Sequence, residues 1–154
     1  MKIALLGVGM MGEAVLAGLV SSGVDAAGIT VTDVRTDRSD ELVSRYGVRF
    51  ATRAVDAVSG ADVVLVVVKP YDVPALLDEI SASLDPDAVV VSLAAGLTLA
   101  QLEAHVAPGQ PVVRVMPNTP AKVGVGMSAI SPGTHATDDH TARASEVMGA
   151  VGEV

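Results

Sequence analysis

Three glycines near the start of the chain have the spacing of a turn that binds the phosphates of a dinucleotide. Gly7, Gly9 and Gly12 follow an apolar run at residues 2–6 and begin a helical segment at residues 10–22. In a Gly-x-Gly-x-x-Gly turn the first glycine permits the tight turn, the second lets the backbone approach a pyrophosphate, and the third lets the helix pack close to the strand. Unpaired N–H groups at the start of the helix then bind the phosphate. The predicted phosphate-binding loop comprises Gly7, Val8, Gly9, Met10, Met11 and Gly12.

The glycine spacing alone is weak evidence, because a chain with 15 glycines forms such patterns by chance. The apolar strand before it, the helix after it and an acidic residue after the next strand make it more specific. A left-handed turn without a ligand is the alternative interpretation.

Residues after the second apolar run, 29–32, would select the ribose of the cofactor. Asp33 lies about 20 residues after Gly12, the position of a carboxylate that binds the adenosine ribose hydroxyls of NAD. Arg35 and Arg38 follow, and a guanidinium there would bind the 2′-phosphate of NADP in a bidentate contact. A solvated start of the next helix is the alternative for both arginines. We predict NADP as the cofactor, with NAD as the alternative, and we include Val34 in this part of the site.

Ligands of open α/β sheets bind outside the carboxyl ends of the strands, so the residues after the later strands are further candidates. Lys69 would orient the cofactor ribose or approach an anionic substrate, or its side chain extends into solvent. Small residues at 94–96 would let a flat ring lie against the backbone, or they form a tight strand-to-helix turn. Asn118 and Thr119 close the same edge. The additional cofactor-binding candidates are Val67, Val68, Lys69, Pro70, Leu93, Ala94, Ala95, Gly96 and Asn118.

No catalytic or metal-binding set can be assembled from the sequence. The chain has no cysteine and three scattered histidines, which excludes a thiolate nucleophile, a disulfide and a cysteine-based zinc site. His135 and His140 flank Asp138 and Asp139, but we expect a solvated loop and helix start there rather than a metal site. Because no acid–base or nucleophile set lies at the predicted strand ends, we predict a cofactor site without catalytic residues and without metal.

Continuous apolar runs rich in β-branched residues alternate with helical segments, a pattern typical of a parallel sheet covered on both faces. We therefore predict an α/β, Rossmann-like, doubly wound fold with a mainly parallel sheet and helices on both faces. Gly23 is predicted to end the first helix in the left-handed conformation, and Ser39, Asp72 and Thr98 to cap helices. The predicted strands are 2–6, 29–32, 48–51, 63–68, 88–93, 112–116, 127–130, introduced by Gly124, and the start of one at 151–154; the predicted helices are 10–22, 39–46, 52–59, 73–84, 99–106 and 137–150.

Composition excludes several kinds of partner. The net charge of −8 and an aromatic content of 2% argue against nucleic-acid binding, which needs a basic face and stacking side chains. The longest apolar runs, such as 63–68, are far shorter than a membrane span. No secretory signal is visible at the amino terminus, so we expect a cytoplasmic protein.

With these motifs in place, the chain resembles the pyrroline-5-carboxylate reductase family, which catalyses the last step of proline biosynthesis. The resemblance implies an NAD(P)H-dependent reduction of the C=N bond of 1-pyrroline-5-carboxylate to L-proline. It also implies that Asn118 lies near the nicotinamide and that the glycine loop holds the pyrophosphate. The motifs that carry it are residues 7–14 (GVGMMGEA), 67–70 (VVKP), 91–96 (VSLAAG) and 113–120 (VRVMPNTP).

Members of that family continue into a helical dimerisation domain that completes the substrate site, and no such domain is visible in this sequence. The resemblance therefore implies that residues 1–154 are one dinucleotide-binding domain of a homo-oligomeric enzyme. On its own this domain is expected to be monomeric or to associate through the surface that the helical domain would cover. It is expected to bind dinucleotide weakly and to turn over little or no imine substrate. A β-hydroxyacid-dehydrogenase-like oxidoreductase and a non-catalytic dinucleotide-binding module are the alternatives.

Overall fold

The structure is a computed structural model that describes residues 1–118, 120–121 and 125–154. Thr119 and Gly124, which the sequence analysis placed at the end of one strand and before another, lie outside the described residues. Within the described residues, no helix is long and apolar enough to cross a lipid bilayer.

The described strands form one sheet in the order β3-β2-β1-β4-β5-β6-β7-β8. Every pairing is parallel except that of β6 with β7. The first six positions have the strand order of a doubly wound dinucleotide-binding fold, in which the order reverses beside β1. The strands are β1 (Ile3–Leu6), β2 (Ile29–Thr32), β3 (Arg49–Phe50), β4 (Val63–Val66), β5 (Val89–Ser92), β6 (Val112–Pro117), β7 (Gly126–Pro132) and β8 (Gly152–Glu153).

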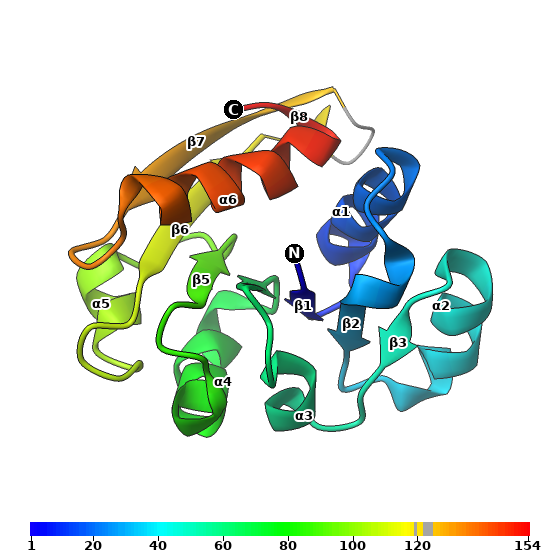
Figure 1. Cartoon of the computed structure of the whole chain (residues 1–154), viewed down its shortest axis with the longest axis horizontal. Coiled ribbons are helices and arrows are strands. Elements are labelled where there is room, and N and C mark those ends of the chain that lie inside the picture. The colour runs from blue at the N-terminus through cyan, green and yellow to red at the C-terminus, as the bar shows by residue number, and fades with distance from the viewer. Residues whose placement is uncertain (119, 122–124) are drawn as a thin grey trace.

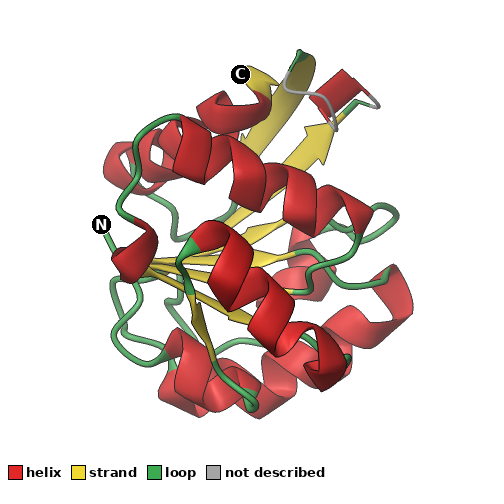
Figure 2. Ribbon diagram, turned by 90° about the vertical axis from the view of Figure 1, so that its right-hand side faces the viewer, coloured by secondary structure: helices red, strands yellow, loops and turns green. Residues whose placement is uncertain are grey.

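Helices cover both faces of this sheet (Figures 1 and 2). One core lies under α1 (Met10–Ser21), α2 (Ser39–Tyr46) and α6 (Asp138–Met148), and it receives Ile3 and Leu5 from β1. The other lies under α3 (Ala54–Val58), α4 (Val73–Ile80) and α5 (Leu99–Glu103), and it receives Ala4 and Leu6. Successive residues of β1 are thus buried on opposite faces, which explains why its sequence is apolar without alternation. The predicted fold class is confirmed.

The predictions that Ser39 and Asp72 cap helices are wrong, and short 3-10 turns explain why. Neither Ser39 nor Asp72 makes a side-chain hydrogen bond to a helix start. Each helix instead follows directly from a 3-10 turn, so that the Ser39 N–H donates to Thr36 and the Val73 N–H donates to Pro70. The backbone of the turn satisfies donors that a side-chain cap would otherwise satisfy. These turns are η1 (Ala26–Gly28), η2 (Thr36–Arg38), η3 (Pro70–Asp72), η4 (Ser81–Ser83) and η6 (Gly149–Val151).

Two other predicted helix ends are confirmed. Gly23 has a φ of +92°, and its N–H donates to the Val20 carbonyl oxygen at 3.2 Å. The Thr98 hydroxyl accepts from the Gln101 N–H at 3.1 Å, and the Gln101 side chain accepts from the Thr98 N–H at 2.9 Å. This reciprocal pair is a capping box.

The predicted element positions are confirmed, while their ends differ by a few residues. Strand β4 ends at Val66 rather than at residue 68, because the chain turns there towards η3. Helix α4 ends at Ile80 and continues as the 3-10 turn η4, and α6 ends at Met148 and continues as η6. Strand β7 is longer than predicted, since it pairs with β6 from Pro132, opposite Val113, to Ser128, opposite Pro117. Contacts in the folded protein set where each element ends, and the local sequence pattern does not reveal these positions.

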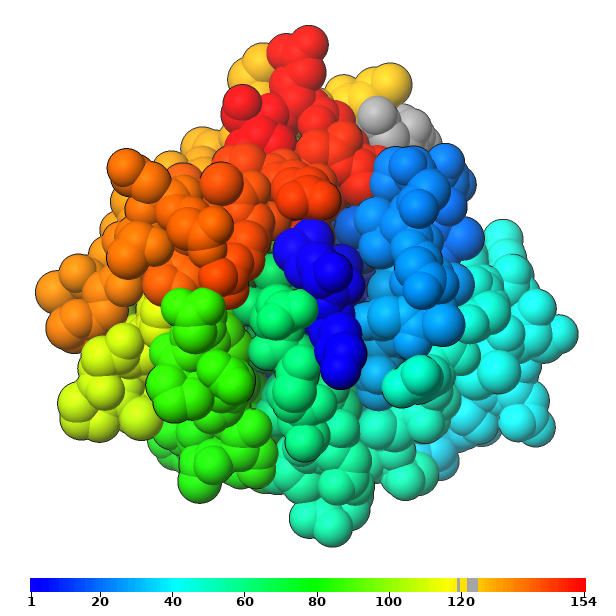
Figure 3. Space-filling view, in the orientation of Figure 1, coloured from blue at the N-terminus to red at the C-terminus, as the bar shows by residue number. Residues whose placement is uncertain are grey.

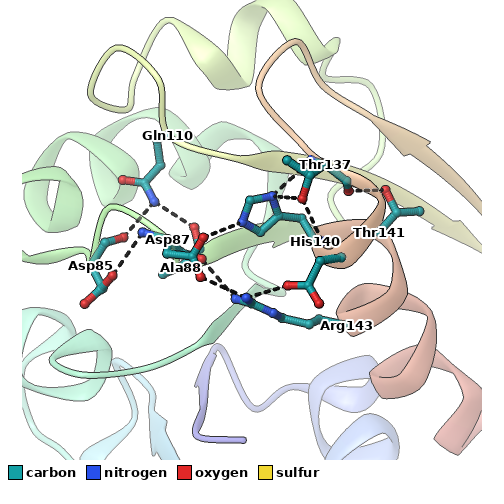
Figure 4. Close-up of polar contacts among 9 residues, drawn as sticks. Asp85, Asp87, Ala88, Gln110, Thr137, His140, Thr141 and Arg143 are labelled. Carbon is teal, nitrogen blue, oxygen red and sulfur yellow. Dashed lines mark hydrogen bonds and ion pairs between the residues drawn. The ribbon is translucent and has the colours of Figure 1, made fainter.

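A polar cluster fastens α6 to the segment before β5 (Figure 4). The Nε2 atom of His140 lies 3.1 Å from Asp87 Oδ1, and the Nδ1 atom accepts from the Thr137 N–H at 3.0 Å. Arg143 donates to the other Asp87 oxygen at 2.8 Å, and the pKa of Asp87 is lowered by Arg143 and His140. The predicted solvated position of His140 is wrong, because its side chain is only 6% exposed.

This cluster lies where α6, drawn in orange, meets the green segment before β5 on the face shown in Figure 3. The cluster lies at the edge of the sheet formed by the amino ends of the parallel strands, since Asp87 precedes β5. No group of three potential metal ligands occurs among the described residues. The contacts therefore hold α6 on the sheet at the edge opposite to the glycine loop.

Candidate functional site

Backbone hydrogen bonds bring the loops after β1, β2, β4 and β5 to one edge of the sheet. The Gly7 N–H donates to the Thr32 carbonyl oxygen at 3.0 Å, which joins the glycine loop to the end of β2. The Val67 N–H donates to the Leu6 carbonyl oxygen at 2.9 Å, and the Leu93 N–H donates to the Val66 carbonyl oxygen at 3.0 Å. The sequence-predicted residues after these four strands are thus neighbours in space. This edge is the position at which doubly wound folds bind ligands.

The glycine loop shows three different environments for its three glycines. Gly7 has a φ of +98°, and a Cβ added to it would lie 2.8 Å from the Val67 carbonyl oxygen. A Cβ on Gly12 would collide with the carbonyl oxygen of Gly7. A Cβ on Gly9 would meet nothing within 4 Å. Gly7 and Gly12 are therefore required by the packing of the loop itself, whereas the space beside Gly9 is open to a ligand.

Helix α1 begins at this open position. Gly9 is its N-cap residue, and the Gly9 carbonyl oxygen accepts from the Glu13 N–H at 2.9 Å. The first N–H groups of a helix have no acceptor within the helix, and they lie at the positive end of its dipole. The amide groups of Gly9, Met10 and Met11 thus form the kind of site that binds phosphate. Met10, the first residue of α1, is 76% exposed.

Asp33 is attached to the backbone of the same loop. Its Oδ2 atom accepts from the Val8 N–H at 2.6 Å, and its Oδ1 atom accepts from the Arg35 N–H at 2.9 Å. Both carboxylate oxygens therefore stabilise the turn between β2 and η2 and its contact with the glycine loop. The contact with ribose hydroxyls that the sequence predicts stays a prediction.

The two candidate arginines differ in their surroundings. The Arg35 side chain is 66% exposed and its guanidinium lies 3.9 Å from Asp37. The Arg38 side chain is only 16% exposed. Its Nη1 atom donates to the Val8 carbonyl oxygen at 2.7 Å, and its Nη2 atom donates to Glu13 Oε2 at 2.7 Å. Arg38 is thus bound to the glycine loop and to the first turn of α1, while Arg35 extends towards solvent.

Glu13 is a residue of the site that sequence reasoning missed. Besides Arg38, its carboxylate accepts from the Tyr46 hydroxyl at 2.8 Å and from Arg45 at 3.2 Å. The hydrogen bond from Arg38 is the main cause of the lowered pKa of Glu13, and burial together with Glu13 raises the pKa of Tyr46. The available signal was an acidic residue in the first helical turn, where the helix dipole favours it. That signal does not identify partners on α2.

The remaining candidates line the same edge in varied environments. Lys69 is exposed and precedes η3, which begins at Pro70, and Val34 is 98% exposed. Leu93 and Ala94 are buried, whereas Ala95 and Gly96 are exposed, and the φ of +80° at Gly96 shows a tight turn. Val67 and Val68 are partly buried, each against a different core.

Asn118 joins the end of β6 to β7 through Met127. Its side-chain Oδ1 accepts from the Met127 N–H at 2.9 Å, and its own N–H donates to the Met127 carbonyl oxygen at 3.1 Å. These bonds give Asn118 a structural role at the end of β6. The contact with the nicotinamide that the resemblance implies stays a prediction.

Comparison with known proteins identifies the family. Residues 2–96 match the family model described as "NADP oxidoreductase coenzyme F420-dependent", and the chain belongs to this family. The chain is 39% identical over 155 residues to a pyrroline-5-carboxylate reductase of Corynebacterium melassecola, covering 99% of this chain and 57% of the relative. It is 37% identical over 153 residues to that of Escherichia coli strain K12, with the same coverage.

A solved structure of a pyrroline-5-carboxylate reductase from Coxiella burnetii superposes with a TM-score of 0.94 at 30% sequence identity. The superposition covers 99% of this chain and 57% of that one. The resemblance to pyrroline-5-carboxylate reductases is therefore confirmed over the whole chain. The chain spans little more than half the length of the curated relatives it matches.

Proposed function

We propose that residues 1–154 bind NADP(H) and form the cofactor-binding domain of a pyrroline-5-carboxylate reductase. The observation that carries this proposal is the geometry of the glycine loop. Gly7 and Gly12 are required to close the turn, while Gly9 offers open space at the start of α1. A Cβ at Gly9 would occupy that space without meeting another protein atom within 4 Å, so a glycine there is explained better by a ligand than by packing.

The reaction in the whole enzyme would be the reduction of 1-pyrroline-5-carboxylate to L-proline in proline biosynthesis. Bound NADPH supplies a hydride for the C=N bond of this imine. The names of the relatives support this reaction over a β-hydroxyacid dehydrogenase or a non-catalytic module. The edge residues of this chain provide binding and orientation, and we assign no proton donor to them.

We assign the cofactor contacts as follows. The amides of Gly9, Met10 and Met11 bind the pyrophosphate. Asp33, Val34 and Arg35 surround the adenosine ribose and its phosphate. The residues on the side of the nicotinamide and its ribose are Val67, Val68, Lys69, Pro70, Leu93, Ala94, Ala95, Gly96 and Asn118.

NADP is the proposed cofactor, with NAD as the alternative. The exposed guanidinium of Arg35 can form a bidentate contact with a 2′-phosphate, and the family to which the chain belongs is one of NADP oxidoreductases. Asp33 would favour NAD if its carboxylate contacted the ribose hydroxyls instead of the backbone.

The proposal includes a helical domain outside residues 1–154 that completes the substrate site and makes the whole enzyme homo-oligomeric, as well as a cytoplasmic location. Residues 1–154 alone would then bind the dinucleotide weakly and reduce little or no imine. Adding the helical domain of a full-length reductase as a separate polypeptide, and following NADPH consumption with 1-pyrroline-5-carboxylate, tests this division of roles. Consumption by residues 1–154 alone at the rate of a complete reductase would refute it.

The proposed cofactor is tested by titrating the purified chain with NADPH and NADH and recording nicotinamide fluorescence. The Gly9→Val variant is the control, because its side chain would occupy the phosphate position. Tighter binding of NADPH that is lost in this variant is the expected result. Tighter binding of NADH would move the assignment to NAD and Asp33, and binding of neither would refute the proposed dinucleotide site.

A further inference from the structure

The peptide group between Val8 and Gly9 is held by residues from two other parts of the chain. The Val8 side chain is buried in the core, with 1% of its surface exposed. The Val8 N–H donates to Asp33, and the Val8 carbonyl oxygen accepts from Arg38 at 2.7 Å. Both backbone polar groups of Val8 and its side chain are thus engaged on the protein side of the loop.

This arrangement fixes the direction of the Gly9 N–H. The chain contains no cis peptide bond among its described residues, and in a planar trans peptide the carbonyl and the following N–H point in opposite directions. Because the Val8 carbonyl is directed to Arg38, the Gly9 N–H is directed away from it. Gly9 itself is the residue with open space beside it. The hydrogen bond that Arg38 donates to the Val8 carbonyl oxygen polarises the peptide group. This polarisation makes the N–H of the same peptide a stronger donor.

Arg38 is itself held in place by acidic side chains. Glu13 Oε2 accepts from it at 2.7 Å, and Glu41 Oε1 lies 3.5 Å from the same nitrogen. Glu13 lies in the first turn of α1 and Glu41 in the first turn of α2. Through these two carboxylates, Arg38 connects the glycine loop, α1 and the start of α2. The charge of Arg38 also offsets the negative charge of Glu13, whose carboxylate lies 2.7 Å from it.

From these contacts we infer that Arg38 is a positioning residue of the dinucleotide site. It orients the Val8–Gly9 peptide so that the Gly9 N–H meets the pyrophosphate, and it leaves the contact with a 2′-phosphate to Arg35. The inference rests on the proposed dinucleotide function. It assigns to the two neighbouring arginines separate effects, since the pyrophosphate is common to NADH and NADPH and the 2′-phosphate is not.

The test compares NADPH and NADH affinities of three glutamine variants of this chain. Arg38→Gln is expected to raise both dissociation constants by the same factor. That factor is about tenfold, the effect of weakening the one charge-assisted hydrogen bond from the Gly9 N–H to the pyrophosphate. The number of binding sites per chain should stay unchanged. Arg35→Gln is expected to raise the dissociation constant of NADPH about tenfold and to leave that of NADH unchanged. Arg45→Gln is the matched control, because Arg45 contacts Glu13 at 3.2 Å and is not bound to the loop.

A spectroscopic readout separates positioning from general loss of structure. In ¹H–¹⁵N spectra without cofactor, the Gly9 amide resonance should shift in Arg38→Gln and stay in place in Arg45→Gln. Arg38→Lys keeps the charge with a single donor group, so it should restore part of the affinity for both cofactors. This variant also serves if Arg38→Gln does not fold.

Three results would overturn the inference while leaving the dinucleotide site intact. They are a selective loss of NADPH affinity in Arg38→Gln, unchanged affinity for both cofactors in that variant, and an unmoved Gly9 resonance. A wild-type chain that binds neither dinucleotide would overturn the proposed function and this inference together.

Discussion

Gly9 and Gly12 lie three residues apart in one loop, yet the structure predicts opposite consequences for the same substitution. Alanine at Gly12 places a Cβ against the carbonyl oxygen of Gly7, a backbone atom that no side-chain rotation can move away. Alanine at Gly9 meets no atom within 4 Å, and the φ of −77° at this residue is an ordinary value for an L-amino acid. The first change should therefore damage the fold and the second should damage only ligand binding.

The expected magnitudes follow from the same contacts. Overpacking at Gly12 costs about 3 kcal/mol or more, and the better helix propensity of alanine returns about 1 kcal/mol, so the net loss is about 2 kcal/mol or more. For a chain of 154 residues, 1 kcal/mol corresponds to about 3 °C in Tm, which gives a decrease of about 6 °C or more. At Gly9, the loss of glycine from an N-cap costs at most about 1 kcal/mol, or about 3 °C.

Binding should respond in the other order. A Cβ at Gly9 would keep the pyrophosphate from the amides at the start of α1. Losing two charge-assisted hydrogen bonds, each worth about 1.5–3 kcal/mol, weakens NADPH binding by a factor of about 100 or more. Thermal unfolding followed by circular dichroism and NADPH titration followed by fluorescence measure the two effects on the same samples.

Two results would refute the reasoning. If Gly9→Ala lowered Tm as much as Gly12→Ala does, Gly9 would serve packing that the structure does not show. If Gly9→Ala were stable and bound NADPH like the wild type, the phosphate would not approach the loop at this residue. The second result would also remove the main support for the proposed function.

Three further predictions concern stability. Thr98→Ala removes the capping box of α5 and should lower the free energy of unfolding by about 1 kcal/mol in chemical denaturation, whereas Thr98→Ser should keep it. Leu65→Ala in the fully buried centre of β4 should cost about 2–5 kcal/mol in the same assay, and a cost below 1 kcal/mol would contradict the packing described. The folded-state pKa of Glu13 lies below its ordinary value of 4.5, so its ion pair stabilises the fold above about pH 4.5 and is lost as the pH falls through the folded-state pKa. Tm should therefore fall less steeply between neutral and acidic pH in Glu13→Gln than in the wild type, and parallel curves would contradict the contribution of Glu13.

Local features of the sequence were sufficient for the fold class and for a prediction of where a dinucleotide would bind. Runs such as Val63–Val66 are apolar at every position because both of their faces are buried, and this property is visible without a structure. The glycine spacing is likewise visible without a structure, since a positive φ at Gly7 and a close approach at Gly12 tolerate few residue types. Gly12 is constrained by Gly7 in the same loop, whereas the close approach of Gly7 to Val67 depends on the fold.

Only the tertiary structure decided which side chains meet across the fold. Arg38 binds Val8 from 30 residues away and Glu13 from 25, and His140 meets Asp87 from 53. Each of these charged or polar residues has a sequence context that equally fits a solvated surface, so hydropathy and spacing do not distinguish them. Their partners depend on how α2 and α6 pack on the sheet, and that packing arises from buried apolar contacts summed over the whole domain. The sequence therefore predicted the edge of the sheet at which a dinucleotide would bind, and the packing of distant elements decided which arginine holds the glycine loop.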